Sequence, residues 1–139
     1  LSYYIVDAQV PVRLSEWVQA NIHSRFVFLI LLNLALLLTG CLMDIFSAIL
    51  VVVPLIIPVG AIFGVHPVHL GVIFLANLGV GYLTPPVGLN LFLASYRFEE
   101  PLPRIYRYVL PFFLAQLAVV IVVTYVPWFS TGLLRVFNF

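Results

Sequence analysis

Small side chains that carry oxygen, together with glycine, surround two adjacent prolines in the second half of the sequence. In chain order, beginning upstream, the residues are Ser47, Asn77, Gly79, Thr84, Pro85, Pro86, Gly88 and Asn90. Hydroxyl, amide and backbone oxygens are hard, neutral ligands, which suit an alkali cation better than a transition metal. Any one of these residues taken alone is equally well explained by a hydrogen bond to a neighbouring helix. The cluster together with the double proline favours a cation site.

Asp44 is the only carboxylate between Arg25 and Glu99, and apolar runs lie on both sides of it. An ionisable side chain in such surroundings suggests a functional site, here a ligand of the same cation. Asp44 also lies three residues before Ser47, where its carboxylate would cap the N-terminus of a helix. The sequence leaves these two roles equally open.

The sequence contains no set of residues typical of an enzyme. It has no GxSxG or HExxH motif and no paired carboxylates, and Ser95 has no evident base. The spacing of His66 and His69 can hold a metal ion, but no Cys or further carboxylate lies near them, so we interpret both as histidines at a membrane interface. We therefore predict that the protein is not an enzyme. A membrane-embedded hydrolase that uses Asp44 or a histidine is the weakest alternative.

The composition shows what surrounds these residues. Of the 139 residues, 64% are hydrophobic and 8% are charged, whereas soluble domains are about a quarter charged. Four stretches carry no charge: 26–43, 45–65, 70–96 and 108–134. Each is long enough to enter a bilayer core of ~30 Å at ~1.5 Å per helical residue. The sequence predicts an all-α membrane protein in a lipid bilayer, and the net charge of +1 gives no reason to expect nucleic acid as a partner.

Residues 1–25 are predicted to form a connector followed by a helix on the membrane surface. Ser15 directly before Glu16 resembles a helix N-terminus. Trp17 suits the headgroup region, where amphipathic rings settle. A transmembrane helix is predicted to follow over 26–39.

The segment 40–64 contains Pro54 and Pro58 near its middle. Proline removes a backbone donor and clashes with the preceding turn, and unpaired backbone groups at membrane depth must face protein or a water-filled cavity. We therefore predict a re-entrant hairpin over 40–64, in which two half-length helices are joined at depth. An outer turn is predicted at 65–69.

The segment 70–96 is predicted to be a broken transmembrane helix, because a residue before proline is pushed out of the helical conformation and Thr84 and Pro85 both precede one. At such a joint, carbonyls of one half-helix can replace water around Na⁺, and amides of the other attract an anionic group. The remaining predicted segments are a cytoplasmic loop at 97–107, a last transmembrane helix at 108–128 and a C-terminal tail at 129–139.

The arginines predict how the chain is oriented in the membrane. If 40–64 is a hairpin, only Arg135 lies on one side. The arginines on the other side are Arg13, Arg25, Arg97, Arg104 and Arg107. The positive-inside rule makes that second side cytoplasmic and places the C-terminus outside.

Four motifs between Gly40 and Phe98 resemble a known family in order and spacing. They are MDIFSA, VPLIIP, PVHLG and NLGVGYLTPPVGLNLF. This run is similar to the second half of the large membrane subunit of TRAP (tripartite ATP-independent periplasmic) transporters, and flanking helices extend the resemblance over most of the chain. Because the chain begins with Leu and lacks the first repeat of that family, we interpret it as the C-terminal portion of a longer subunit. This portion alone is not expected to transport.

The resemblance implies a fold and a function. Such subunits contain two inverted repeats, each with a re-entrant hairpin and a broken helix, and are multi-pass permeases of the bacterial or archaeal cytoplasmic (inner) membrane. They import organic acids such as C4-dicarboxylates or sialic acid, with Na⁺ as the coupling ion and no other cofactor. A periplasmic substrate-binding protein delivers the acid, and a small four-helix membrane subunit braces the scaffold.

The resemblance also implies that the TPPVG motif and the tip of the hairpin contribute one Na⁺ site and part of the substrate wall, without separating the residues that contact each. Combined with the chemistry of the residues above, this gives the following assignments. The expected Na⁺ ligands are Asp44, Ser47, Asn77, Gly79 and Thr84. The expected substrate-binding residues are Pro85, Pro86, Gly88 and Asn90. The main alternative is a different broken-helix carrier or a channel. A channel would need neither a binding protein nor a Na⁺ gradient.

Overall fold

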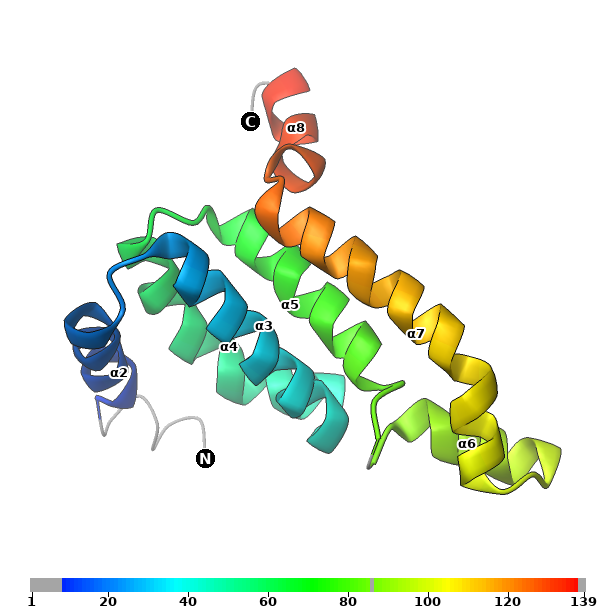
Figure 1. Ribbon diagram of the computed structural model, residues 1–139. Coiled ribbons are helices and arrows are strands. Elements are labelled where there is room, and N and C mark those ends of the chain that lie inside the picture. The colour runs from blue at the N-terminus through cyan, green and yellow to red at the C-terminus, as the bar shows by residue number, and fades with distance from the viewer. Residues whose placement is uncertain (1–8, 86, 138–139) are drawn as a thin grey trace.

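The computed structural model describes residues 9–85 and 87–137, and this part of the chain is built from helices (Figure 1). In order they are α2 (Val10–Asn21), α3 (Arg25–Leu42), α4 (Ile45–Ile62), α5 (Pro67–Gly81), α6 (Leu89–Phe98), α7 (Leu102–Tyr125) and α8 (Trp128–Val136). No strand occurs within the described residues, and the predicted all-α class is confirmed.

Within residues 9–85 and 87–137, three helices are long and apolar enough to cross a membrane. α3 and α4 have 18 residues each and α7 has 24, while the apolar helix α5 is shorter at 15 residues. Many large apolar side chains on the three long helices point away from the rest of the protein, including Leu34, Leu50 and Phe112. Such a surface is unfavourable in water and favourable in lipid. The chain is a multi-pass membrane protein.

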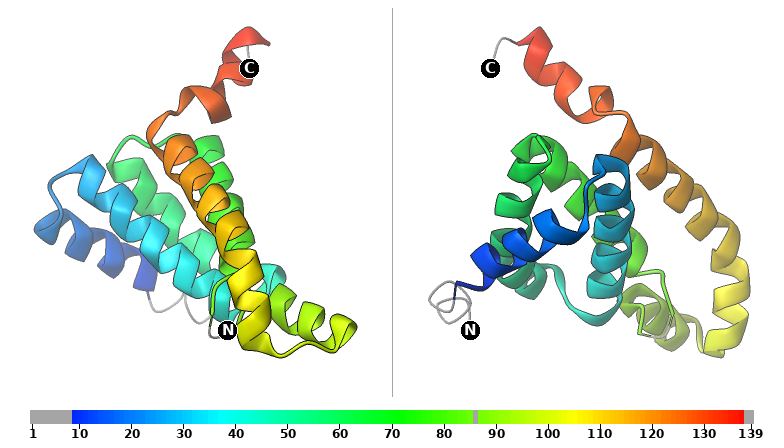
Figure 2. Two further views of the ribbon diagram at one scale, coloured as in Figure 1. Left: turned by 45° about the vertical axis from the view of Figure 1, so that its right-hand side comes forward. Right: turned by 60° about the vertical axis from the view of Figure 1, so that its left-hand side comes forward.

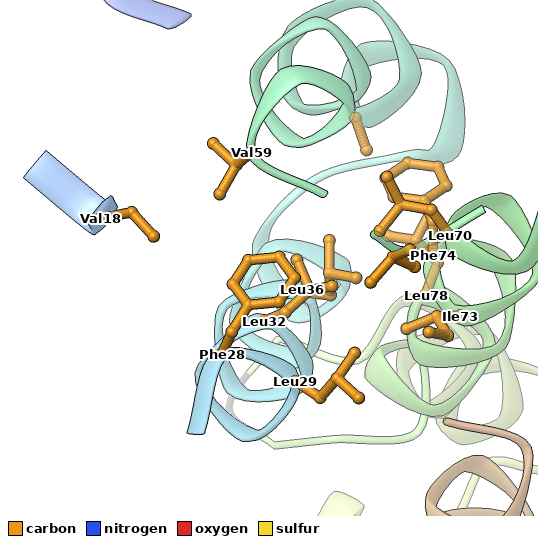
Figure 3. Packing of buried hydrophobic residues seen from close by; sticks show 12 residues of the cluster. Val18, Phe28, Leu29, Leu32, Leu36, Val59, Leu70, Ile73, Phe74 and Leu78 are labelled. Carbon is orange, nitrogen blue, oxygen red and sulfur yellow. The ribbon is translucent and has the colours of Figure 1, made fainter. Parts of the chain in front are cut away.

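The packed core lies among α3, α4 and α5. α3 and α5 run in the same direction and α4 runs in the opposite one (Figure 1). Leu32 and Leu36, one turn apart on α3, belong to the stripe of apolar residues that this helix buries. Figure 3 shows Leu36 beside Phe74 of α5. At the end of α4, the ring of Phe63 stacks on that of Phe28 with centroids 4.4 Å apart.

α4 is one continuous helix from Ile45 to Ile62, with Pro54 and Pro58 inside it. The prediction that two half-helices meet at these prolines is therefore wrong. Each proline still lacks the N–H that would bond to the carbonyl four residues earlier. The carbonyls of Leu50 and Pro54 thus lose their usual partners, but the neighbouring turns hold the helical path.

The apolar segment after α4 is divided into α5 and α6, with residues 82–88 between them. α7 then runs back in the opposite direction alongside both helices (Figures 1 and 2). The stretch 82–88 therefore lies partway along the length of α7, rather than at either of its ends.

Several helix ends differ from the predictions. Pro11 lies in the first turn of α2, where its missing N–H needs no partner, so the predicted helix start at Ser15 is wrong. The predicted loop 97–107 ends within the first turns of α7, and the predicted tail 129–139 contains most of α8. The first eight residues of the predicted connector lie outside the described residues.

The arginine arrangement also differs from the prediction. Arg25, at the start of α3, and Arg135, in α8, line one cavity. The prediction that they lie on opposite sides of the membrane is therefore wrong. Arg97 and Arg104 flank the turn between α6 and α7, at the other end of the helix bundle (Figure 2).

Candidate functional site

α5 ends in a tightened turn before the double proline. The Leu83 N–H donates to the Val80 carbonyl at 3.0 Å, and the Thr84 N–H donates to the Gly81 carbonyl at the same distance. The Thr84 hydroxyl donates to the Val80 carbonyl at 2.9 Å. These bonds satisfy carbonyls at the helix end and direct the following backbone out of the helix. Because the hydroxyl uses its one proton here, its lone pairs remain able to accept.

Gly88 precedes α6 with φ of 36°, a left-handed conformation that glycine adopts without steric cost. A Cβ at this position would lie 3.0 Å from the carbonyl oxygen of Thr84 and 3.1 Å from that of Tyr82. Both oxygens therefore face the point where a Cβ of residue 88 would stand, and Leu91 Cδ1 lies 2.9 Å from the same point. Carbonyl oxygens released by a helix interruption are the groups that coordinate alkali cations in transporters with broken helices.

The α3–α4 turn, defined here as residues 40–44 and thus including the end of α3, lies against this interruption through Gly40 and Cys41. A Cβ on Gly81 would lie 2.7 Å from the Cα of Gly40, so the backbones of α5 and α3 touch at these glycines. The Cys41 thiol donates to the Thr84 carbonyl at 3.3 Å. Two stretches of chain that are far apart in sequence, the α3–α4 turn and residues 82–88, therefore form one site.

Asp44 is the N-cap of α4. Its Oδ2 accepts from the N–H of Phe46 at 2.9 Å and from the N–H of Ser47 at 3.1 Å. Its Oδ1 accepts from the Ser47 hydroxyl at 2.6 Å. The carboxylate thus satisfies donors that the start of a helix leaves unpaired, and the capping role is confirmed.

Two substitutions of Asp44 should separate the effect of its helix-capping hydrogen bonds from the effect of its negative charge. Asp44→Ala removes the acceptor for the N–H groups of Phe46 and Ser47, and we expect the melting temperature of the purified protein in detergent to fall by several degrees. Asp44→Asn keeps an acceptor oxygen, because asparagine caps helices about as well as aspartate. Its melting temperature should equal that of the wild type, and an equal loss in both variants would contradict the cap.

A buried polar cluster joins α3, α5 and α7. The side-chain amide of Asn77 donates to the Ile73 carbonyl at 2.8 Å and to Oδ1 of Asn33. The Thr124 hydroxyl approaches the same Asn33 oxygen at 3.3 Å. Asn77 Oδ1 is buried without a hydrogen-bond partner among the described residues. Because Asn77 and Gly81 are four residues apart, they share the face of α5 that packs on α3.

The other predicted site residues are more exposed. Gly79 lies at a hollow that Gln116 of α7 also lines, away from the contact with α3. Pro85 and Asn90 are exposed on either side of Pro86, which lies outside the described residues.

The predicted site residues therefore lie at several separate places in the structure. Thr84 and Gly88 meet at the interruption. Asp44 and Ser47 share the start of α4, and Asn77 lies one turn from the end of α5. Their roles as ligands stay predictions.

Several contributors to the site were given no role by the sequence analysis. Cys41 and Asn33 both bond to residues of the candidate site. Asn33 and Gly40 are seven residues apart, so they share one face of α3, and this spacing could have indicated the contact with α5. His69 is buried within the protein, and its Nδ1 hydrogen-bonds with the hydroxyl of Ser130; its predicted place at the membrane interface stays a prediction.

The fold and the site define a helical, multi-pass membrane protein in which the end of α5 packs on the end of α3, just before the chain turns into the antiparallel helix α4. Residues 1–129 match the family model described as "Tripartite ATP-independent periplasmic transporter, DctM component". The chain belongs to this family.

Proteins that are similar to this chain in sequence are also named as TRAP transporter permeases. The chain is 36% identical over 132 residues to the C4-dicarboxylate TRAP transporter large permease protein DctM of Pseudomonas aeruginosa, covering 95% of this chain and 31% of that protein. It is 32% identical over 135 residues to the sialic acid TRAP transporter large permease protein SiaM of Vibrio cholerae, covering 97% and 32%. It is 35% identical over 119 residues to the isethionate TRAP transporter permease protein DctMQ of Oleidesulfovibrio alaskensis, covering 86% and 19%.

These relatives are named as transporter permeases, which supports the prediction that the protein is not an enzyme. The chain spans about a third of the length of the first two and about a fifth of the third.

Proposed function

We propose that this chain is the C-terminal part of a Na⁺-coupled permease subunit that imports an organic acid delivered by a periplasmic binding protein. The observation that carries the proposal is the contact between the α3–α4 turn and the interruption at 82–88, where the carbonyl oxygens of Tyr82 and Thr84 converge. Polar backbone at membrane depth persists where protein or a bound ligand satisfies it.

In this proposal α3 and α4 form a re-entrant hairpin with its tip at Met43 and Asp44. α5 and α6 together form one broken crossing. The support is geometric: Cys41, two residues before the tip, bonds to Thr84, and the interruption lies partway along α7 (Figure 1). The start of α3 and the end of α4 then face the same side of the membrane, together with the loop before α5.

Sodium is the ion that this site suits. The converging carbonyls of Tyr82 and Thr84 are neutral oxygen ligands. Asn77 Oδ1 is a buried acceptor without a partner among the described residues, which costs about 1–3 kcal/mol when nothing offsets it. Ser47 and Asp44, at the hairpin tip, complete the proposed ligand set, whereas Gly79 lies against α7 and is left out of it.

An anionic substrate suits the other side of the interruption. The start of α6 presents amide groups and the positive end of a helix dipole, which favour an anion. Gly88 and the exposed residues Pro85 and Asn90 lie at this end, next to Pro86. The names of the relatives above mention C4-dicarboxylates, sialic acid or isethionate. We propose an organic acid of this kind, without choosing among them.

The family supports two partners and a location. A tripartite system implies a small membrane subunit, proposed here to have four helices, and a periplasmic binding protein. We place the assembly in the inner membrane, with the turn between α6 and α7 cytoplasmic. That turn is flanked by Arg97, Arg104 and Arg107, and short cytoplasmic loops favour arginine.

Uptake by the full-length permease tests this function. The permease that contains this chain, its small subunit and its binding protein are reconstituted in liposomes, and entry of a labelled C4-dicarboxylate and of sialic acid is measured under Na⁺ or K⁺ gradients. We expect uptake of one acid only with Na⁺ and the binding protein. Uptake that needs neither would indicate a channel and overturn the proposal.

Thr84→Val should weaken the Na⁺ dependence of that uptake. It removes an oxygen at the proposed site with little change in shape, and we expect the Na⁺ concentration for half-maximal uptake to rise about tenfold, the loss of roughly one hydrogen-bond-strength contact. Thr131→Val is the matched control. Its hydroxyl makes the same bond to a carbonyl four residues earlier, at the other end of the bundle. Unchanged Na⁺ activation in Thr84→Val would exclude its hydroxyl as a ligand.

Asp44→Asn tests whether the hairpin carboxylate also binds the ion. If the charge of Asp44 helps to hold Na⁺, this variant should need more Na⁺ for the same uptake although its cap is intact. Normal uptake at every Na⁺ concentration would restrict Asp44 to the capping role.

A further inference from the structure

A cavity of about 410 Å³ lies at the end of the bundle opposite the proposed ion site. Four nitrogen-bearing side chains from three helices and one loop line it: Arg25 of α3, His66 before α5, His69 of α5 and Arg135 of α8. Among the described residues no acidic side chain lines it, and neither arginine forms an ion pair. The cavity therefore concentrates positive charge that nothing in the described chain neutralises.

A second cavity, of about 340 Å³, adjoins the first. Both are lined by Arg25 and Pro127. The walls of the second are otherwise mainly apolar and come from Phe26 and Leu29 of α3 and Tyr125 of α7. The rings of Phe26 and Tyr125 stack with centroids 4.9 Å apart. A charged pocket and a mainly apolar groove between α3 and α7 thus share Arg25 and Pro127 as walls.

We propose that these two cavities bind one anionic phospholipid, with its phosphate between Arg25 and Arg135 and an acyl chain along the groove between α3 and α7. The amphiphile explains both cavities together, whereas a water-soluble anion would use the first alone. The position fits as well, because the site lies where the apolar helices α3 and α7 reach their ends and phospholipid headgroups are expected.

The helix that supplies Arg135 is held in place by hydrogen bonds. His69 Nε2 lies 3.1 Å from the Thr124 carbonyl of α7, and its Nδ1 hydrogen-bonds with the hydroxyl of Ser130 in α8. α8 also exposes Trp128 and Phe129, apolar rings that suit the membrane interface. The cationic pocket is therefore built by an anchored interfacial helix rather than by a mobile arginine.

Lipid retention by the full-length permease tests the proposal. The purified protein is incubated with phosphatidylglycerol or phosphatidylcholine of identical acyl chains, and the lipid retained is measured by native mass spectrometry. The wild type should retain phosphatidylglycerol. The double variant Arg25→Gln/Arg135→Gln should retain roughly tenfold less, since each arginine near an anionic lipid contributes to its binding. Retention of phosphatidylcholine should not change.

Two controls keep the test decisive if the double variant is poorly folded. Arg25→Lys/Arg135→Lys keeps the charge and should retain most of the phosphatidylglycerol. Arg104→Gln removes an arginine at the opposite end, paired with Glu100, and should retain all of it. Equal retention by wild type and double glutamine variant would overturn the proposal. Full displacement of the bound phosphatidylglycerol by millimolar inorganic phosphate would also overturn it, because it would indicate a site for a free anion. If the double glutamine variant keeps the lipid but no longer associates with the periplasmic binding protein, the cavity is instead a docking surface for that protein, and the proposal is likewise overturned.

Discussion

Among substitutions of a glycine by alanine, each of which adds one methyl group, Gly81→Ala is expected to lower the stability of the protein most. The added Cβ would lie 2.7 Å from both the Cα and the carbonyl carbon of Gly40. These are backbone atoms that cannot rotate away, so α3 and α5 must separate where the α3–α4 turn meets the interruption. Overpacking of this kind costs about 1–3 kcal/mol and sometimes more. Thermal unfolding of the full-length permease in detergent should show a much lower melting temperature, and Na⁺-dependent uptake should be lost.

Gly71→Ala is the matched control for that variant. Gly71 lies in the same helix, and a Cβ added there meets no atom within 4 Å. Alanine is also the better helix former, so this variant should be at least as stable as the wild type. If Gly71→Ala and Gly81→Ala unfold at the same temperature, the backbone contact between α3 and α5 does not exist in the protein.

Gly88→Ala is expected to abolish Na⁺-dependent uptake while the protein still inserts and folds. Alanine at a φ of 36° is strained by roughly 1–2 kcal/mol. Its methyl group would also lie 2.9 Å from Leu91 Cδ1, 3.0 Å from the Thr84 carbonyl oxygen and 3.1 Å from that of Tyr82. It would occupy the point on which the proposed Na⁺ ligands converge. Uptake at saturating Na⁺ should fall at least about tenfold, which corresponds to about 1.4 kcal/mol.

Gly64→Ala is a control that separates the effect of backbone strain from the effect of blocking the proposed ion site. Gly64 also has positive φ, 68°, but a Cβ there meets nothing within 4 Å. This variant should have a similar loss of stability and a normal dependence of uptake on Na⁺. Equal Na⁺ dependence in Gly88→Ala and Gly64→Ala would exclude the interruption as the place where the ion binds.

The sequence predicted the helical membrane class because that property depends on local composition. Long uncharged runs indicate apolar helices wherever they occur, and α3, α4 and α7 fall within such runs. The end of α5 before Pro85 was also predictable from the local sequence, since a residue before proline leaves the helical conformation. Helix starts were less accurate. The proline of α2 was taken as part of a connector, although Pro11 stands in the first turn of a helix.

The continuous path of α4 was not predictable by the same local rule. Pro54 and Pro58 each remove one backbone bond, but the 18-residue helix retains the others and packs Val59 and Gly60 against its neighbours. Tertiary packing thus outweighs the local preference. The hairpin predicted at 40–64 also put Arg25 and Arg135 on opposite sides of the membrane, whereas both line one cavity.

The candidate site depends on contacts between distant segments, which one sequence does not specify. Thr84 and Gly88 were recognisable from the double proline beside them. The approach of Cys41 to Thr84 spans 43 residues of sequence. Asp44 was left with two roles because both place a carboxylate before Ser47, and only the geometry of its oxygens identified the cap.

Modification of Cys41 gives the most direct test that the α3–α4 turn and residues 82–88 form one Na⁺ site. Cys41 is the only cysteine in the chain, and its thiol bonds to the Thr84 carbonyl. In a full-length permease with any other cysteines replaced, its rate of alkylation by N-ethylmaleimide is measured in NaCl and in choline chloride. If Na⁺ binds at the interruption and holds the turn against it, alkylation should be several-fold slower in NaCl. The same rate in both salts would contradict the site.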